Sequence, residues 1–138
     1  MIKRLTLYTD GGARGNPGPA ASAFLALNEN GNVQMSGSKY VGLRTNNQAE
    51  YEALILALEY AYSVNAEEVV CYLDSELVAR QMKGEYSVKN LELRKLYLKA
   101  HALRVKFKKI EFYNVARTNL FIQKADALVN KTLDENIA

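Results

Sequence analysis

Thr45-Asn46-Asn47-Gln48-Ala49-Glu50-Tyr51-Glu52-Ala53-Leu54 is the stretch at which the sequence changes from the short runs typical of strands to the periodicity of a helix. One face of this helix, at the i, i+3, i+4 spacing, holds Glu50, Ala53, Leu54, Ala57, Leu58 and Ala61. Thr45 or Asn46 is expected to cap it. Glu50 departs from the pattern, because an ionised carboxylate on a buried face is costly unless a cation or hydrogen bonds compensate it. The sequence therefore predicts a positive partner for Glu50.

Three strands are predicted before this helix. Residues 2–9 are rich in β-branched and aromatic side chains and stop at Asp10-Gly11-Gly12, a sequence typical of a turn that needs the backbone freedom of glycine. Residues 20–27 and 33–41 predict two further strands, joined by a polar hairpin turn over residues 28–32. Three strands joined in this way form an antiparallel meander.

The remaining segments alternate between helix and strand. They are a strand over 67–73, a helix over 75–83 closed by Gly84, a helix over 91–103, a strand over 105–115 and a helix over 121–135. This order predicts an α/β fold, in which a five-stranded mixed sheet has an antiparallel meander, then parallel strands, and is flanked by helices. A chain of 138 residues with 49% hydrophobic content fits a single domain, residues 1–138.

Composition narrows the class of protein. The single cysteine, Cys71, cannot form an internal disulfide and suits a reducing compartment, so a cytoplasmic location is expected. The sequence opens without a leader and has no apolar run near the ~18 residues that span a bilayer, so we expect neither secretion nor a membrane partner. A net charge of +3 permits an anionic partner such as nucleic acid without requiring one.

Three further acids accompany Glu50. Asp10 and Asp74 stand at the carboxyl ends of predicted strands, the edge at which open sheets bind ligands. Asp126 is expected on the buried face of the last helix, together with Val129, Asn130, Leu133 and Ile137. Four converging carboxylates need a counter-ion, and oxygen ligands without nearby cysteine or histidine pairs favour Mg²⁺ or Mn²⁺ over zinc.

Each acid also has a plain structural interpretation. Asp10 before two glycines is typical of a turn, and Asp74 could begin a helix. Glu50 could be a surface position if the phase of its helix slips by one residue. The joint occurrence of the acids favours the functional interpretation.

Four motifs occur in order along essentially the whole chain. They are Tyr8-Thr9-Asp10-Gly11-Gly12 with Gly15-Asn16-Pro17-Gly18, the stretch Thr45 to Leu54 quoted above, Asp74-Ser75, and Ala125-Asp126-Ala127-Leu128-Val129-Asn130. Together they closely resemble the type 1 ribonuclease H (ribonuclease HI) family. The resemblance implies a ribonuclease H-like fold in its compact form, without a hybrid-binding domain or basic protrusion. It also implies an endonuclease that hydrolyses the RNA strand of RNA/DNA hybrids by two-metal-ion catalysis and leaves 5′-phosphate and 3′-hydroxyl ends.

The same resemblance implies roles for individual residues. Asp10 would bridge two ions of Mg²⁺ or Mn²⁺, Glu50 and Asp74 would complete the ligands of one ion, and Asp126 would hold the other. Thr45 would contact a phosphate of the DNA strand. The other substrate contacts would be made along the minor groove of the RNA strand, by Gly11, Gly12, Asn16, Asn46, Asn47 and Gln48. Amides suit this role because they donate and accept hydrogen bonds, as a ribose 2′-hydroxyl does. Helix capping and turn formation are the structural alternative for these residues.

The loop before the last helix departs from the family pattern. Many relatives carry a histidine there, whereas the one histidine of this chain, His101, lies in the 91–103 helix and is expected near the surface. Arg117 is the candidate replacement: it could bind phosphate or stabilise charge, but it cannot act as a general acid or base at neutral pH. A plain surface arginine is the alternative. Phe121 and Ile122, at positions often polar in relatives, are expected to pack.

Two other functions stay open at this stage. A transposase, integrase or junction resolvase shares the acidic site but acts on DNA, and a catalytically silent module would bind hybrids without cutting them. The cluster of asparagine and glutamine argues against the first, and the presence of all four acids argues against the second. We expect a monomer without an obligatory protein partner.

Overall fold

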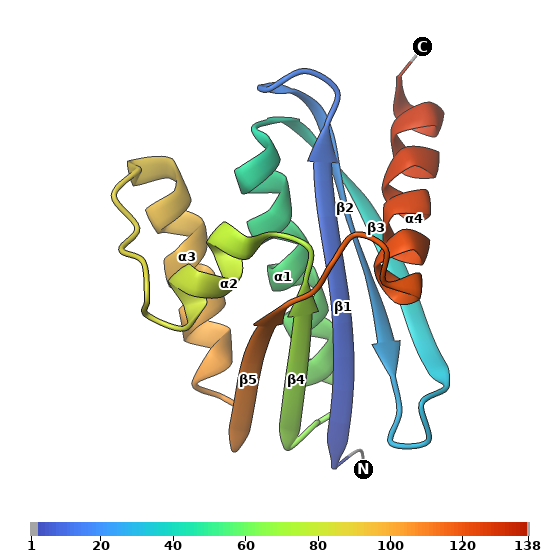
Figure 1. The fold of residues 1–138 in the computed structure, drawn as a ribbon, viewed down its shortest axis with the longest axis vertical. Coiled ribbons are helices and arrows are strands. Elements are labelled where there is room, and N and C mark those ends of the chain that lie inside the picture. The colour runs from blue at the N-terminus through green and yellow to red at the C-terminus, as the bar shows by residue number, and fades with distance from the viewer. Residues whose placement is uncertain (1–2, 138) are drawn as a thin grey trace.

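Five strands form one mixed sheet in the order β3-β2-β1-β4-β5, with helices on both faces (Figure 1). The computed structural model describes residues 3–137; position 2, which the sequence assigned to the first strand, lies outside this range. The strands are β1 Arg4–Ala13, β2 Gly18–Leu27, β3 Val33–Arg44, β4 Glu68–Leu73 and β5 Lys109–Asn114. The helices are α1 Asn46–Ser63, α2 Glu76–Met82, α3 Leu91–Arg104 and α4 Leu120–Asn136.

The strand pairing confirms the predicted topology. β1, β2 and β3 form an antiparallel meander, while β4 pairs in parallel with both β1 and β5. The α/β class and the five-stranded mixed sheet are therefore as predicted. Because β1 and β4 are parallel neighbours and their pairing ends at Thr9 and Leu73, the residues that follow these two, Asp10 and Asp74, lie side by side.

The two faces of the sheet carry cores of different size. On one face α1, α2 and α3 pack over large side chains of β1 and β4, among them Leu5, Leu7 and Leu73. On the other face α4 packs against Ala21 and Ala23 of β2, whose small side chains let the helix lie close to the strand. Figure 1 shows α4 standing apart from the other three helices. Across residues 3–137, no helix combines the length and apolar character needed to cross a membrane.

β1 is longer than the sequence indicated. The predicted turn at Asp10-Gly11-Gly12 is wrong, because Gly11 and Gly12 continue the strand and pair with Ser22 and Ala21 of β2. Glycine is needed at position 11 for close approach and not for a turn. A Cβ at this position would lie 2.3 Å from the carbonyl oxygen of Ala49 in α1, far inside van der Waals contact. Gly11 therefore lets the helix backbone rest directly on the strand.

The predicted ends of two other strands also needed correction. The strand expected over 105–115 is confined to Lys109–Asn114, because Val105 is the C-cap of α3 and residues 106–108 turn the chain toward the sheet. β3, expected over 33–41, continues to Arg44 because its pairing with β2 extends to that residue. Side-chain pattern alone does not mark where a ladder of hydrogen bonds ends.

The start of α1 is fixed by a capping box. The hydroxyl of Thr45 accepts a hydrogen bond from the Gln48 N–H at 3.1 Å, and the Gln48 side chain accepts one from the Thr45 N–H at 2.8 Å. Of the two predicted caps, Thr45 is therefore the right one. The Asn46 side chain instead accepts a hydrogen bond from the Ala13 N–H at 2.8 Å, which ties the first turn of α1 to β1.

Substitution at Gly11 tests the close approach of α1. Gly11→Ala should lower the free energy of unfolding by about 1–3 kcal/mol or more, because the new methyl group must displace helix backbone. Gly12→Ala is the matched control. The nearest atom to a Cβ there is Val129 Cγ1 at 3.7 Å, an ordinary contact, so stability should change by less than about 0.5 kcal/mol. Urea unfolding followed by circular dichroism measures both, and equal stability of the two variants would contradict the contact.

Candidate active site

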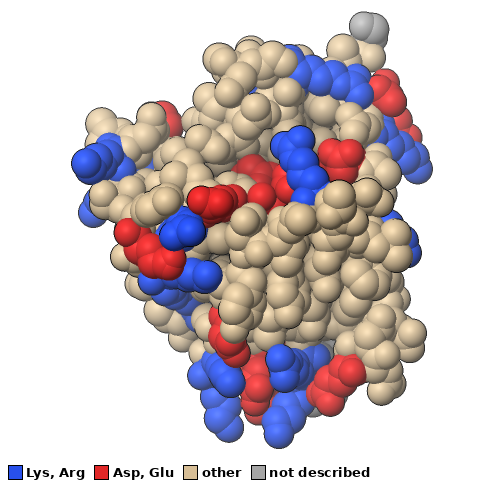
Figure 2. Space-filling model, in the orientation of Figure 1, with Lys and Arg blue, Asp and Glu red and all other residues tan. Residues whose placement is uncertain are grey.

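Three carboxylates from separate elements meet where the pairing of β1 with β4 ends. Asp10 lies just past the last β1–β4 pair, Thr9 with Leu73, and Asp74 follows β4 directly. Glu50 comes from the amino-terminal part of α1. One oxygen of each acid lies within 4.8 Å of the others. Figure 2 shows acidic side chains gathered near the middle of the face drawn, beyond the end of β4, with basic side chains beside them.

Burial and repulsion raise the pKa values of two of these acids. Asp10 and Glu50 are only 5% and 7% exposed. Desolvation, and then the charge of Asp74, raises the pKa of Asp10 to about 7. Desolvation, and then the charge of Asp10, raises the pKa of Glu50 well above its usual range, although the Gly11 N–H donates a hydrogen bond to the Glu50 carboxylate. The predicted compensation of Glu50 is therefore only partly supplied by the protein itself.

Asp126 approaches the same place from α4. A small cavity is lined by Asp10, Asp74, Arg117, Ile122, Gln123 and Asp126. Asp126 does not belong to the group of three whose oxygens lie within 4.8 Å of one another. Its predicted place on the buried face of the last helix is wrong: that face consists of Ile122, Ala125, Val129, Thr132 and Leu133. Asp126 is exposed and lies next to that face. It is near the other acids because it lines the same cavity, and not because it is buried.

Arg117 reaches the acids from the loop before α4. Its Nε lies 3.3 Å from a carboxylate oxygen of Asp74, while its side chain is 88% exposed. The packing predicted for the two apolar residues after this loop is confirmed, since Ile122 is buried and the ring of Phe121 lies 4.9 Å from that of Tyr8, centroid to centroid. His101 is exposed on α3, as predicted, and is not among the residues that line the acidic cavity.

The donor set fits a hard divalent cation. Its ligand atoms are carboxylate oxygens, which Mg²⁺ and Mn²⁺ prefer, and within residues 3–137 neither cysteine nor histidine belongs to the group. Among the ion pairs of those residues, the one from Arg117 to Asp74 is the sole pair that reaches the group. Within the described part of the chain, Asp10 and Glu50 therefore have no basic side chain paired with them, which suits the binding of divalent metal.

The residues predicted to contact substrate gather around the start of α1. An open groove there is lined by Asn16, Thr45, Asn47, Gln48, Asn90, Glu92 and Leu93. Asn46 adjoins it, and its backbone N–H donates to the Asn16 side chain at 3.0 Å. Gly11 and Gly12 lie in β1, next to Asp10. The structure thus brings polar residues of the β1–β2 loop and of α1 to one groove, and their contact with substrate stays a proposal.

Several residues of this region were not predicted. Asn90 lines the groove but is recognisable in sequence only as the N-cap of α3. Gln123 lines the acidic cavity three residues before Asp126. Asn130 contacts the Asp126 carboxylate, and its i+4 spacing was the available signal. Arg14 contacts Asn130 from 116 positions away, for which the sequence offers no local signal.

Comparison with known proteins identifies the relatives of this chain. A family model described as reverse transcriptase-like matches residues 8–132. The ribonuclease HI of Halobacterium salinarum is 38% identical over 133 residues, which cover 96% of this chain and 65% of that protein. A bifunctional protein of Mycobacterium tuberculosis is also 38% identical over 133 residues, which cover 95% of this chain and 36% of that protein. The chain therefore spans less than two thirds of the length of these two relatives.

A solved structure matches over nearly its full length. It is the ribonuclease H1 called LC11, isolated from compost, in complex with an RNA/DNA hybrid. The likeness has a TM-score of 0.91 and 39% sequence identity, and it covers 97% of this chain and 99% of the other. The acids beside the end of β4 thus lie in a chain that belongs to the type 1 ribonuclease H (ribonuclease HI) family.

Proposed function

We propose that residues 1–138 form one ribonuclease H domain that hydrolyses the RNA strand of RNA/DNA hybrids, using two ions of Mg²⁺ or Mn²⁺ and leaving 5′-phosphate and 3′-hydroxyl ends. The observation that carries this proposal is the group of Asp10, Glu50 and Asp74, three oxygen donors within 4.8 Å, with Asp126 lining the same cavity. The hybrid in the solved structure of the compost ribonuclease H1 supports the substrate class.

The four acids would divide between two ions. Asp10 would be shared by both, Glu50 and Asp74 would complete the ligands of one, and Asp126 would serve the other. Bound divalent ions in such sites polarise the scissile phosphate and activate the attacking water. The protein's own part is to hold the carboxylates at fixed distances: Asp10 by the pairing of β1, Glu50 by burial against Gly11.

Substrate selection would come from the groove at the start of α1. Asn16 and Asn46 use their side-chain oxygens to accept backbone hydrogen bonds, so they would meet a ribose 2′-hydroxyl with their NH₂ groups. The Thr45 hydroxyl accepts from the Gln48 N–H and still has a proton to donate to a DNA phosphate. Capping and substrate binding are therefore compatible roles for these residues.

Cleavage of labelled duplexes tests the proposal directly. With Mg²⁺ or Mn²⁺ the RNA strand of a hybrid should be cut and an all-DNA duplex of the same sequence left intact. Asp10→Asn should lower kcat by roughly 100-fold or more while hybrid binding persists, and Glu135→Gln, an exposed acid of α4, should not. An intact RNA strand at high enzyme concentration would end the proposal. Cleavage of the DNA duplex instead would indicate a DNA-acting nuclease, and binding without cleavage a silent module.

The raised pKa values predict how pH affects the metal-free protein. The pKa of Asp10 is about 7 in the folded state, whereas an unfolded aspartate titrates near ~3.9, so between these values the folded state keeps a proton that the unfolded chain has lost. This contribution to the free energy of unfolding is present below pH ~4 and is lost as pH rises to about 7.

Urea unfolding at pH 5 and pH 8, with EDTA or with Mn²⁺, measures this dependence. At pH 8 in EDTA, Asp10→Asn should be more stable than the unsubstituted protein by on the order of 2 kcal/mol, because a neutral amide replaces a repelled carboxylate. Mn²⁺ should stabilise the unsubstituted protein more at pH 8 than at pH 5, since its ligands must be deprotonated. No gain in Asp10→Asn at pH 8 would contradict the raised pKa of Asp10.

Arg117 has a separate test. If its guanidinium holds substrate phosphate beside Asp74, Arg117→Ala should lower kcat about tenfold without removing a limb of the pH–rate profile, because arginine does not titrate in this range. Arg94→Ala on α3 removes the same charge from an exposed site and controls for net charge. Equal activity of the two variants would make Arg117 a plain surface residue.

A further inference from the structure

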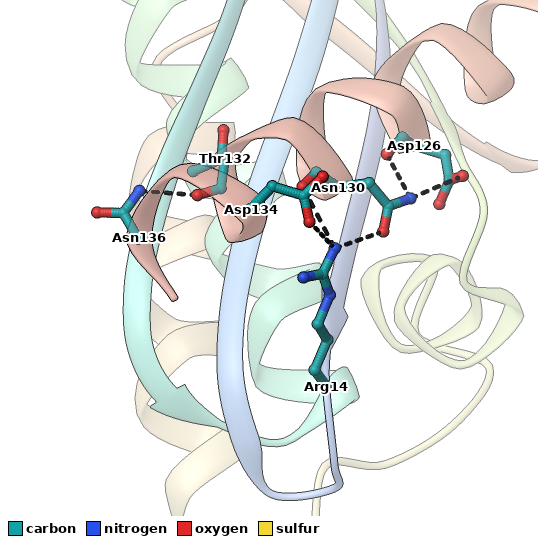
Figure 3. A network of polar contacts seen from close by, with 6 residues as sticks. All are labelled: Arg14, Asp126, Asn130, Thr132, Asp134 and Asn136. Carbon is teal, nitrogen blue, oxygen red and sulfur yellow. Dashed lines mark hydrogen bonds and ion pairs between the residues drawn. The ribbon is translucent and has the colours of Figure 1, made fainter. Parts of the chain in front are cut away.

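A polar network joins the loop after β1 to α4 (Figure 3). One terminal nitrogen of Arg14, Nη2, lies 2.7 Å from a carboxylate oxygen of Asp134 and 3.4 Å from both the backbone and the side-chain oxygen of Asn130. The Asn130 Nδ2 in turn donates to the backbone oxygen of Asp126 at 3.1 Å and to its carboxylate at 3.3 Å. Asn130 therefore connects Arg14 to the fourth acid of the proposed site.

The chemistry of the partners fixes which way the Asn130 amide faces. Arginine can only donate hydrogen bonds and an ionised carboxylate can only accept them. The Asn130 oxygen must therefore face Arg14 and its NH₂ group must face Asp126. Arg14 supports this orientation from the oxygen side of the amide, so Arg14 acts on Asp126 through Asn130.

Asp126 is the acid that most needs such support. Asp10 and Glu50 are buried, but Asp126 is exposed on the surface of α4, where an aspartate side chain has several rotamers of similar energy. Hydrogen bonds from neighbouring groups are the usual means by which proteins orient a ligating carboxylate. The Asn130 NH₂ group occupies that position here.

The same network ties Asp126 to the predicted substrate loop. The Arg14 backbone N–H donates to the Pro19 oxygen at 2.8 Å and closes the loop that carries Asn16. Asn16 accepts from the backbone of Asn46, at the start of α1. The loop is thus fastened to α1 on one side and, through Arg14, to α4 on the other.

We propose that Asn130 is a positioning residue that orients the Asp126 carboxylate, and that Arg14, anchored by Asp134, sets the orientation of Asn130. This relay rests on the proposed function, because its purpose is to hold Asp126 ready for metal. In this relay Asn130 acts through its contact with Asp126, and Arg14 acts through Asn130.

Kinetics of two variants at Asn130 test the relay. Asn130→Ala should lower kcat about tenfold and raise the Mn²⁺ concentration for half-maximal cleavage by a similar factor, with KM for the hybrid nearly unchanged. Asn130→Asp keeps an acceptor for Arg14 but loses the donor and adds charge beside Asp126, so its loss should be at least as large. If Asn130→Ala has the same kcat and the same Mn²⁺ dependence as the unsubstituted protein, the proposal is overturned.

Asn136→Ala is the matched control on the same helix. The Asn136 side chain donates to the backbone oxygen of Thr132, four residues earlier, at 2.7 Å, as Asn130 does to Asp126, but it contacts no acid of the site (Figure 3). This variant should cleave at the rate of the unsubstituted protein. An equal loss in Asn130→Ala and Asn136→Ala would indicate an effect on the helix alone and would overturn the relay.

Arg14→Ala tests the outer step. Its loss of kcat should be smaller than that of Asn130→Ala, and the double variant should lose less than the product of the single losses, because both act through one contact. A raised KM at constant kcat would mean that Arg14 binds substrate phosphate directly, and would overturn its part in the relay.

Two measurements on the protein without substrate separate this proposal from the proposed function. In the metal-free protein one Asn130 side-chain amide proton should be shifted downfield by NMR, and the shift should disappear in Asp126→Asn. Calorimetric titration with Mn²⁺ should give an affinity about tenfold lower in Asn130→Ala. If the unsubstituted protein fails to cut hybrids, the proposed function fails while these two results still stand. An unshifted amide proton with unchanged Mn²⁺ affinity would overturn the relay alone.

Discussion

The contact between Gly11 and the first turns of α1 is the constraint on which the acidic site depends. Because position 11 has no Cβ, the backbone of Ala49 and Glu50 rests on β1, and the Ser22 hydroxyl holds the Ala49 carbonyl at 2.6 Å. The Gly11 N–H then donates to the Glu50 carboxylate. A helix displaced by the width of one methyl group would move Glu50 away from Asp10. The spacing between Glu50 and Asp10 thus depends on the absence of a side chain at Gly11.

The fold gathers like charges at a place where stability alone would favour apolar residues. Asp10 and Glu50 are desolvated and repel each other. Arg117 pairs with Asp74, but its side chain is exposed, so solvent weakens this ion pair. Such conflict between local energetics and the rest of the fold is typical of functional sites. The large core beneath α1 includes Tyr51, Leu54 and Leu58, and its burial stabilises the fold enough to offset the repulsion between the acids.

The sequence predicted those features that follow from local pattern. Glu50 stood out because it interrupts an apolar helix face, and Thr45 because capping is a property of neighbouring residues. Asp126 was identified by a family motif and by helix periodicity, but the burial that periodicity predicted is wrong, because the boundary of the buried face is one residue away. Gly11 was predicted to lie in a turn. The real reason for glycine there is contact with a helix residue 39 positions later, and no neighbouring residue in the sequence indicates that contact. Arg14 was missed because its partners belong to the last helix.

Because the cores on the two sides of the sheet differ in size, the elements that carry the four acids are held to the sheet with different strength. α4 lies on alanines of β2, which bury little apolar area, whereas α1 lies over leucines. Subglobal opening that undocks one helix requires less free energy than global unfolding, and α4 is the element with the smaller core. Such a species would keep its sheet, its main core and the cluster of three acids but would lose Asp126. Thermal inactivation of this protein would then precede melting and reverse on redocking of a single helix.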